Sequence, residues 1–264
     1  MQIIFQKAFT KSLDKTGEEM QKLSVKYGYD FVPITIEAFS HKVVEDIEFD
    51  TSRKDWFAYG SSAMVDVVRE HGLKPGVFDC IANERIVAEK YGEQYLNHDL
   101  MHTNRKTIFD DIAEFNEYAF FVKPVDRKYF PGTIVDKDSL RFVLISQIFP
   151  DTTPSDYDII VSPVKMIEKE WRLFYVDGEF VTGSQYHAAM MRLEINPNVP
   201  EYVIGYADSV VHGIWMPSDN FVIDVALMKD GEMKVVEVNE LNYSGLYASN
   251  VNDLLIAVDQ YLNK

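Results

Sequence analysis

The stretch that decides the fold runs from Lys229 to Ala248 and reads KDGEMKVVEVNELNYSGLYA. It opens with Asp-Gly, a strong short-range signal for a β-hairpin turn. An apolar strand follows, and a loop rich in Asn, Ser and Gly ends it. Inside the strand, Glu237 and Asn239 stand among valines, where a buried acid is costly without a partner. This segment therefore predicts a hairpin whose second strand carries chemistry.

The hairpin turn also predicts which residues face each other. A two-residue loop at Asp230 and Gly231 puts Asp224 of the first strand directly opposite Glu237. Asn239 shares their face, because side chains alternate along a strand. Two facing carboxylates repel each other. Either one takes up a proton, or a cation lies between them.

The ligand types in this trio suit one kind of cation. Two carboxylates and an amide oxygen are hard donors of the sort that bind Mg²⁺ shared with phosphates. The structural alternative is a register slipped by one residue, with Glu237 in solvent or Asp224 capping a turn. From the hairpin alone, both interpretations stay open.

A basic segment upstream supplies complementary charge. The sequence FVKPVDRKYFPGTIVD places Lys123 at the end of an apolar strand, followed by Arg127, Lys128 and Gly132. A glycine-bearing turn with nearby cations can hold phosphate oxygens. An exposed hairpin with ordinary surface cations fits the same residues. The chain has neither a Walker A sequence nor a GxGxxG motif.

Composition limits the classes of function. The 264 residues are 47% hydrophobic and 13% aromatic, as expected of a folded protein, and the net charge is −16. This acidic balance disfavours a nucleic-acid binder with a broad basic surface. A single cysteine, Cys80, excludes an internal disulfide and a Cys-rich zinc site. With no long apolar run and no signal-like start, a cytoplasmic protein is expected.

The texture of the chain changes near residue 105. Before it, short apolar runs alternate with helix-like stretches, which predicts a small α/β domain over residues 1–105. After it, strands are expected over 118–125 and 139–149, then two Asp-Gly hairpins with a helix between them and a helix at the end. Residues 106–264 are therefore predicted to form an α+β domain on antiparallel sheets.

Taken in order, three segments resemble one superfamily: FVKP with KYFPGTIV, then VSPVKMIEKEWRLFYVDGEFVTGSQY, then DVALMKDGEMKVVEVNELNYSGLYA. The chain resembles the ATP-grasp superfamily, and in particular a small phage and bacterial clade distantly related to ribosomal-protein glutamate ligases. The resemblance covers roughly residues 118–250. It implies an α/β N-terminal domain followed by an α+β ATP-grasp domain with antiparallel sheets.

The resemblance also implies roles for individual residues. The residues expected to bind ATP are Lys123 and Lys128 on the phosphates, Gly132 in the loop that covers them, the hinge segment Val161 to Lys165 with Val164 around the adenine, Glu170 near the ribose, and Arg172 toward the phosphates. One or two Mg²⁺ ions are expected on Asp224, Glu237 and Asn239. Asn242, Ser244 and Gly245 are expected to shape the adjoining acceptor or phosphate pocket.

The reaction that the resemblance implies is an ATP- and Mg²⁺-dependent, ADP-forming carboxylate–amine ligation through an acyl-phosphate, with Lys123 and Arg172 as catalytic cations. Its substrates would be small-molecule or peptide carboxylates and amines, with no nucleic-acid or membrane partner. Two alternatives stay open: a metal-dependent phosphoesterase or nuclease, and a non-catalytic nucleotide-binding module. A phage-encoded protein would work in the host cytoplasm.

Several features near the expected site are less determined by the sequence. The phosphate-covering loop has one glycine where many relatives have several, and the basic residue expected before the domain could be Lys90 or Lys106. Tyr186 is expected to pack or to line the acceptor pocket. His187 is a weaker candidate for a catalytic base.

Overall fold

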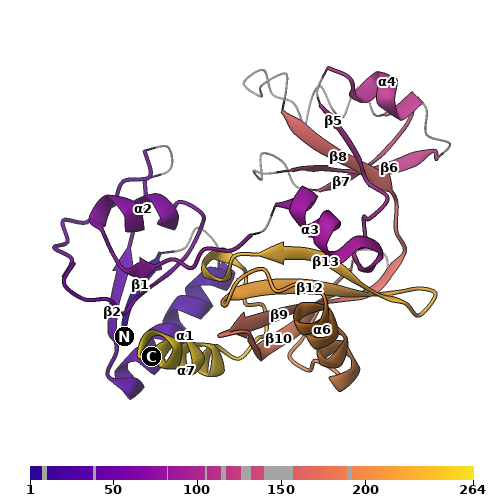
Figure 1. The fold of residues 1–264 in the computed structure, drawn as a ribbon. Helices are drawn as coiled ribbons and strands as arrows, with labels where there is room; N and C mark the ends of the chain where they lie inside the picture. The colour runs from indigo at the N-terminus through magenta and orange to yellow at the C-terminus, as the bar shows by residue number, and fades with distance from the viewer. Residues whose placement is uncertain are drawn as a thin grey trace.

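The computed structural model describes residues 1–7, 11–37, 40–81, 83–104, 106–113, 117–125, 132–139, 157–188 and 192–264. These residues form one parallel and two antiparallel sheets, with helices packed against them (Figure 1). The fold class predicted from the sequence is confirmed. The strand predicted over 139–149 lies, apart from Ser139, outside the described residues.

The N-terminal part is a parallel sheet covered on both faces. Its strands have the order β2-β1-β3-β4, and the elements are β1 (Gln2–Gln6), α1 (Lys11–Tyr27), β2 (Asp30–Ile34), β3 (Trp56–Tyr59), α2 (Met64–His71) and β4 (Pro75–Gly76). Every residue of β1 is buried, as expected for a central strand between two helical layers. Ile3 and Phe5 face the layer that contains Met20 of α1, whereas Ile4 faces Met64 and Val67 of α2.

A small antiparallel sheet follows in the middle of the chain. Its order is β5-β8-β6-β7, and the elements of this region are α3 (Glu84–Tyr91), η1 (Gly92–Gln94), β5 (Met101–Asn104), α4 (Ile108–Ala113), β6 (Ala119–Pro124), β7 (Thr133–Asp136) and β8 (Asp158–Pro163). Ile108 and Ile112 of α4 pack on the sheet beside Phe120 and Val161. Lys123 lies near the end of β6, where the strand leaves this core.

The third sheet has five antiparallel strands in the order β11-β10-β9-β12-β13. Its elements are β9 (Ile167–Val176), β10 (Glu179–Ala188), β11 (Arg192–Asn196), α6 (Glu201–Gly213), β12 (Phe221–Met228), β13 (Met233–Asn239), η3 (Leu241–Tyr243) and α7 (Val251–Leu262). One face packs on α6 and α3 through Trp171, Tyr175 and Val225. The other face is split, and Phe174 and Val222 near one end pack on α7.

Both Asp-Gly hairpins form, but with different turns. Asp177 and Gly178 have φ values of 58° and 78° and join Val176 to Glu179 in a two-residue loop, as a type I′ turn requires. In the second hairpin, Met228 N donates to Glu232 O at 2.8 Å and Gly231 has a φ of 93°. Its loop therefore has three residues, and the predicted two-residue loop is wrong.

A β-bulge in β13 nevertheless restores the predicted pairing. The register shifts between Val225, which pairs with Val235, and Asp224, which pairs with Glu237. Val236 is the extra residue, and it compensates for the longer loop. Asp224 thus lies opposite Glu237, as the sequence predicts, although for a different reason.

The parts of the chain interlock rather than follow one another. The C-terminal α7 lies beside α1 (Figure 1), and Leu254 and Leu255 share a core with Ile3 and Phe5. Residues 101–104, just before the predicted boundary at 105, form β5 and pair with β8. The division into residues 1–105 and 106–264 stays a prediction.

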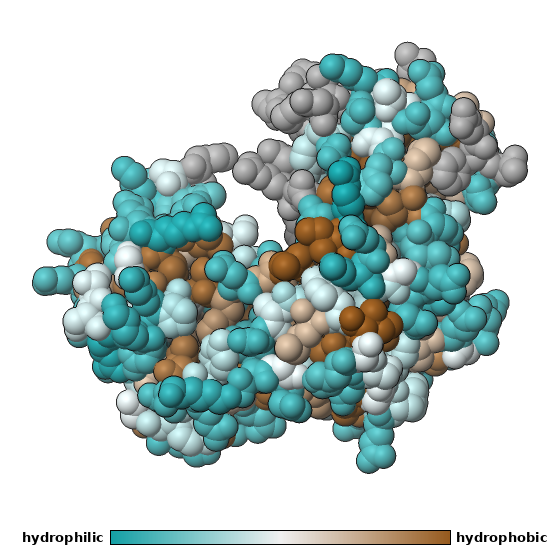
Figure 2. Space-filling model, in the orientation of Figure 1, coloured by the Kyte–Doolittle hydropathy of each residue, from teal (hydrophilic) through white to brown (hydrophobic). Residues whose placement is uncertain are grey.

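The surface agrees with the acidic composition. On the face shown in Figure 2 hydrophilic residues predominate, and apolar residues are exposed in separate patches. Among the described residues, none of the helices is both long and apolar enough to span a bilayer. Cys80 is a free thiol, and burial raises its pKa to about 12, which keeps it protonated at neutral pH.

Candidate active site

The centre of the site is an ion pair on the polar half of the five-stranded sheet. Arg172 of β9 pairs with Asp224 of β12 in the ladder, and the two side chains point to the same face. Arg172 Nε donates to Asp224 Oδ1 at 2.9 Å and Nη2 donates to Oδ2 at 2.7 Å. Asp224 is fully buried and Arg172 is 8% exposed. This two-pronged geometry fixes both side chains.

The next strand adds Glu237, which joins this sheet to the smaller one. Glu237 Oε1 accepts from Asn239 Nδ2 at 2.7 Å and lies 3.5 Å from Arg172 Nη2. Glu237 Oε2 accepts from Lys123 Nζ of β6 at 2.8 Å. Because Lys123 belongs to a different sheet, this contact brings the two predicted clusters, basic and acidic, into one site.

Lys123 has a second partner that the sequence analysis missed. Glu84, the first residue of α3, forms an ion pair with Lys123 and accepts a hydrogen bond from the Tyr95 hydroxyl. Glu84 is 5% exposed. An acid in the first turn of a helix ordinarily indicates an exposed, dipole-stabilised side chain, so no local signal in the sequence could assign Glu84 to the site.

Negative charge exceeds positive charge in this cluster. Its carboxylates are Glu84, Glu170, Asp224 and Glu237, and its permanent cations are Lys123 and Arg172. The protein groups thus leave an excess of two negative charges in a largely buried site. A divalent cation would balance this excess.

The pKa values show the same imbalance. Burial, opposed by Arg172 and reinforced by Glu237 and Glu170, raises the pKa of Asp224 from 3.8 to about 7. Burial disfavours the charge of Lys123, but Glu237 and Glu84 outweigh it and raise the pKa of Lys123 well above its ordinary value. Lys123 is therefore a permanent cation, whereas Asp224 titrates near neutral pH.

The three predicted metal ligands fit Mg²⁺ in donor type. Asp224, Glu237 and Asn239 bring hard oxygen atoms to one face of neighbouring strands. The carboxylates are held by Arg172, Lys123 and the Asn239 amide. In the part of the chain that the structure describes, no group of three or more His, Cys, Asp and Glu side chains has the arrangement of a closed metal site. Charge balance, rather than a finished cage, supports a metal here.

Tyr186 and Glu170 extend the site along the sheet. The register between β10 and β9 shifts between Gln185 and His187, so Tyr186 is the extra residue of a bulge, a device that re-aims a side chain. Its hydroxyl hydrogen-bonds to Glu170 and lies 3.1 Å from Asp224 Oδ2. His187 Nδ1 lies 3.2 Å from Glu170 Oε2. The sequence suggested packing or pocket lining for Tyr186, and the hydrogen bonds place it within the charged cluster.

The predicted hinge segment contains residues in different settings. Val161 lies in the central strand of the small sheet, with its side chain in the core. Val164 follows the end of β8 and is half-buried. Lys165 forms an ion pair with Asp99. Only Val164 and Lys165 lie beyond the strand ladder.

The remaining basic and glycine candidates have other settings. Lys128 is outside the described residues. Gly132 precedes β7, and a Cβ there would clash with the ring of Phe121, so close packing alone accounts for this glycine. Lys90, in the last turn of α3, and Lys106 are exposed.

The loop after β13 divides its predicted residues between two tasks. Ser244 and Gly245 line a cavity. Asn242 is fully buried and ties the loop to the parallel sheet. Its Oδ1 accepts from Phe78 N at 2.7 Å, and its Nδ2 donates to Ala58 O at 2.6 Å and to Gly76 O at 3.2 Å.

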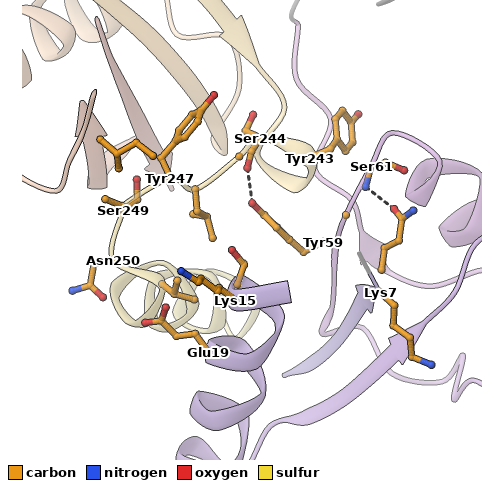
Figure 3. Close-up of a pocket in the computed structure, with 18 residues that line it drawn as sticks. Lys7, Lys15, Glu19, Tyr59, Ser61, Tyr243, Ser244, Tyr247, Ser249 and Asn250 are labelled. Atoms are coloured by element: carbon orange, nitrogen blue, oxygen red, sulfur yellow. Dashed lines mark hydrogen bonds between the residues drawn. The ribbon is translucent and has the colours of Figure 1, made fainter. Parts of the chain in front are cut away.

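The cavity lies between the parallel sheet, α1 and this loop (Figure 3). Its volume is about 1130 Å³. Its walls come from the carboxyl ends of β1 and β3, from α1, from β11 and from the loop; they include Gln6, Lys7, Lys15, Thr16, Glu19, Tyr59, Gly60, Ser61, Ile195 and residues 243–251. Tyr59 donates from its hydroxyl to Ser244 O at 2.5 Å. The carboxyl ends of parallel strands are a common position for ligands in α/β folds.

Tyr247 lies between this cavity and the charged cluster, and the sequence did not indicate it. Its ring stacks on Tyr186 with centroids 4.8 Å apart and planes 4° from parallel. Its φ of 51° is in the left-handed region, which no sequence pattern around a tyrosine predicts.

Comparisons with known proteins agree with this geometry. Residues 102–257 match a family model described as an ATP-grasp domain, the second family of its clade. No curated protein matches.

Solved structures show the same fold across the whole chain. An ATP-grasp RimK domain protein from Sphaerobacter thermophilus is 12% identical with a TM-score of 0.61, covering 100% of both chains. D-cycloserine synthetase is 13% identical with a TM-score of 0.64, covering 99% of both. D-alanine–D-alanine ligase from Bacillus anthracis, complexed with ATP, is 16% identical with a TM-score of 0.61, covering 100% of this chain and 97% of its own.

Proposed function

Because this chain belongs to that family of ATP-grasp domains, we propose that it is an ATP- and Mg²⁺-dependent ligase that joins a carboxylate to an amine. The observation that carries the proposal is the convergence of Lys123, Arg172, Asp224 and Glu237 from two sheets in one buried cluster. Solved relatives named as ligases, one of them with ATP bound, support it.

The reaction has two steps. An oxygen of the substrate carboxylate attacks the γ-phosphorus of ATP, and the bond from that phosphorus to the bridging oxygen breaks, releasing ADP. The amine nitrogen then attacks the acyl carbon, the carbon–oxygen bond to phosphate breaks, and the nitrogen loses a proton. Lys123 and Arg172 offset the charge that builds on the phosphoryl oxygens. Positioning and electrostatics suffice, so no nucleophilic side chain is required.

Asp224, Glu237 and Asn239 would hold Mg²⁺ in this proposal. The ion would bridge phosphate oxygens and neutralise their charge. The excess of two negative charges in the cluster is the feature of this chain that supports it. Glu170, Val164 and Lys165 are proposed nucleotide contacts, with Lys128 and Gly132 on the phosphate side.

The cavity between the parallel sheet and the loop after β13 is the proposed acceptor pocket. Ser244 and Gly245 contribute to its wall, and Asn242 holds the loop in place. A volume of about 1130 Å³ admits a small molecule or the end of a peptide. A cytoplasmic location, in the host if the gene is carried by a phage, is part of the same proposal.

Thermal unfolding with nucleotides tests the proposal. ATP with Mg²⁺ at about 100 times its Kd should stabilise the protein by about 2.7 kcal/mol, a shift in Tm on the order of 5–10 °C. Glu237→Gln should abolish most of this shift. The matched control is Glu232→Gln in the same hairpin, where the side chain is 63% exposed.

The outcome separates three functions. Nucleotide stabilisation followed by ADP release with a panel of carboxylates and amines supports the ligase. Stabilisation without turnover on any pair identifies a binding module. Hydrolysis of phosphoesters without ATP identifies a metal-dependent phosphoesterase. Absence of any Mg²⁺-dependent nucleotide shift in the wild type rejects the ligase.

A further inference from the structure

Tyr247 adopts a backbone conformation that costs free energy. Its φ of 51° belongs to the left-handed region, which residues with a bulky side chain rarely enter. Neither Gly nor Asn, the residues that tolerate this region, stands at the position. The ring that this backbone places must therefore contribute interactions that offset the strain.

The ring of Tyr247 covers Arg172. The guanidinium carbon of Arg172 lies 5.3 Å from the ring centroid of Tyr247 and 5.3 Å from that of Tyr186. Such contacts between a cation and aromatic rings are attractive, more so when water is excluded. Gly245 completes the cover, since a Cβ there would lie 3.8 Å from Arg172 Nη1.

The same ring forms part of the cavity wall. Tyr247 is 45% exposed and lines the cavity, whereas Arg172 behind it is 8% exposed. In Figure 3 Tyr247 and the α1 residues Lys15 and Glu19 lie on different sides of the cavity. One side of the ring thus meets the charged cluster and the rest meets the cavity.

The contact continues from Tyr247 into the cluster. Tyr186, stacked against it, donates to Glu170 and lies 3.1 Å from Asp224 Oδ2. Within the described part of the chain, no hydrogen bond of the Tyr247 hydroxyl is found. The aromatic ring, not the hydroxyl, makes the connection.

We infer that Tyr247 is a positioning residue that holds the Arg172 guanidinium against Asp224 and separates the acceptor cavity from the phosphoryl-transfer groups. The inference rests on the proposed function for its catalytic half. With the ring in place, water in the cavity has no open path to an acyl-phosphate beside Arg172. Without the ring, Arg172 becomes accessible and the acyl-phosphate is hydrolysed before the amine attacks.

Three variants separate the ring from the backbone and the hydroxyl. Tyr247→Gly removes the ring, and glycine adopts the left-handed backbone without strain. Tyr247→Asn removes the ring with a side chain that also tolerates this region. Tyr247→Phe keeps the ring and removes only the hydroxyl.

Labelling with phenylglyoxal, which reacts with guanidinium groups, tests the cover directly. In Tyr247→Gly and Tyr247→Asn, Arg172 should be modified about five-fold faster or more than in the wild type, as measured by peptide mass spectrometry. Tyr247→Phe should react at the wild-type rate. Arg85, whose side chain is 59% exposed, serves as the internal standard. Equal Arg172 labelling in the wild type and Tyr247→Gly overturns the inference.

A turnover measurement tests the catalytic half. With the substrate pair that releases most ADP, Tyr247→Gly should release more ADP per amide formed than the wild type, and Tyr247→Phe should match it. Unchanged coupling in Tyr247→Gly overturns this half. If the wild type binds no nucleotide while the labelling behaves as expected, the proposed function and the catalytic half fall, and the positioning of Arg172 stands.

Discussion

At the scale of single residues, the site depends on how Lys123 is compensated. Its side chain is 16% exposed and lies between Glu84 and Glu237, which are 6% and 19% exposed. Removing one member of such a buried group leaves the others without compensation, which costs more than the pair contributes when intact.

We therefore expect Lys123→Met to destabilise the protein as well as weaken nucleotide binding. The loss in free energy of unfolding should be about 3 kcal/mol, measured by urea denaturation without nucleotide. Adding Glu84→Gln to the same chain should recover part of it, because one uncompensated charge is removed. The control Lys229→Met, at the exposed hairpin loop, should change stability little. A Lys123→Met protein as stable as the wild type would contradict the buried ion pairs.

Asp224 gives a prediction about pH. Its pKa is about 7 in the folded state against an ordinary value of 3.8, so the folded protein binds this proton more tightly than the unfolded chain. The stabilisation from the proton is complete below about pH 4 and is lost as the pH rises through 7.

Asp224→Asn keeps the neutral form at every pH. Its free energy of unfolding relative to the wild type should increase by roughly 2 to 4 kcal/mol between pH 5 and pH 8, measured in urea with EDTA present. Asp230→Asn, on the exposed loop of the same hairpin, should show no such trend. A difference between wild type and Asp224→Asn that is constant with pH would mean that Asp224 stays ionised throughout.

At the scale of elements, α3 places Glu84 beside Lys123. The helix is capped by Asn83, whose Oδ1 accepts from Arg85 N at 3.0 Å and Ile86 N at 3.3 Å. Loss of this cap should fray the first turn, where Glu84 stands.

Asn83→Ala should lower the free energy of unfolding by about 1 kcal/mol, and the Glu84 end of α3 should exchange amide hydrogens faster. Asn83→Asp, which keeps an acceptor at the cap, should retain most of the stability. If Asn83→Ala and Asn83→Asp unfold alike, the cap does not hold the helix.

The success of sequence reasoning also varies by element. Periodicity and Asp-Gly signals predicted the strands, most of the helices and the facing of Asp224 and Glu237, because these depend on local pattern. The three-residue loop and the Val236 bulge were missed, since each depends on the other and their effects on register cancel. The positions of Glu84 and Tyr247 could not be predicted, because they arise from packing between segments distant in sequence and from a backbone that sequence pattern disfavours.

At the scale of the whole molecule, Asn242 connects the catalytic sheet to the parallel sheet. Its side chain satisfies three backbone groups, of Ala58, Gly76 and Phe78, and Gly60 N donates to its carbonyl at 3.1 Å. The side chain is fully buried, so water cannot replace a lost partner there.

Asn242→Ala should therefore cost about 3 kcal/mol or more in the free energy of unfolding. The Phe78 amide should lose its protection from hydrogen exchange, since Asn242 Oδ1 is its acceptor. Asn263→Ala, at the exposed end of α7, is the matched control and should have a small effect. A Phe78 amide that stays protected in Asn242→Ala would argue against this connection.

The paired irregularities of the β12–β13 hairpin have a consequence for how relatives diverge. A chain with a loop shorter by one residue and no bulge would bring the same acid opposite Asp224. Insertions and deletions in this hairpin can therefore pass through evolution in compensating pairs, without moving the carboxylates. A search for distant relatives by sequence pattern should let the separation between the two acids vary by one residue.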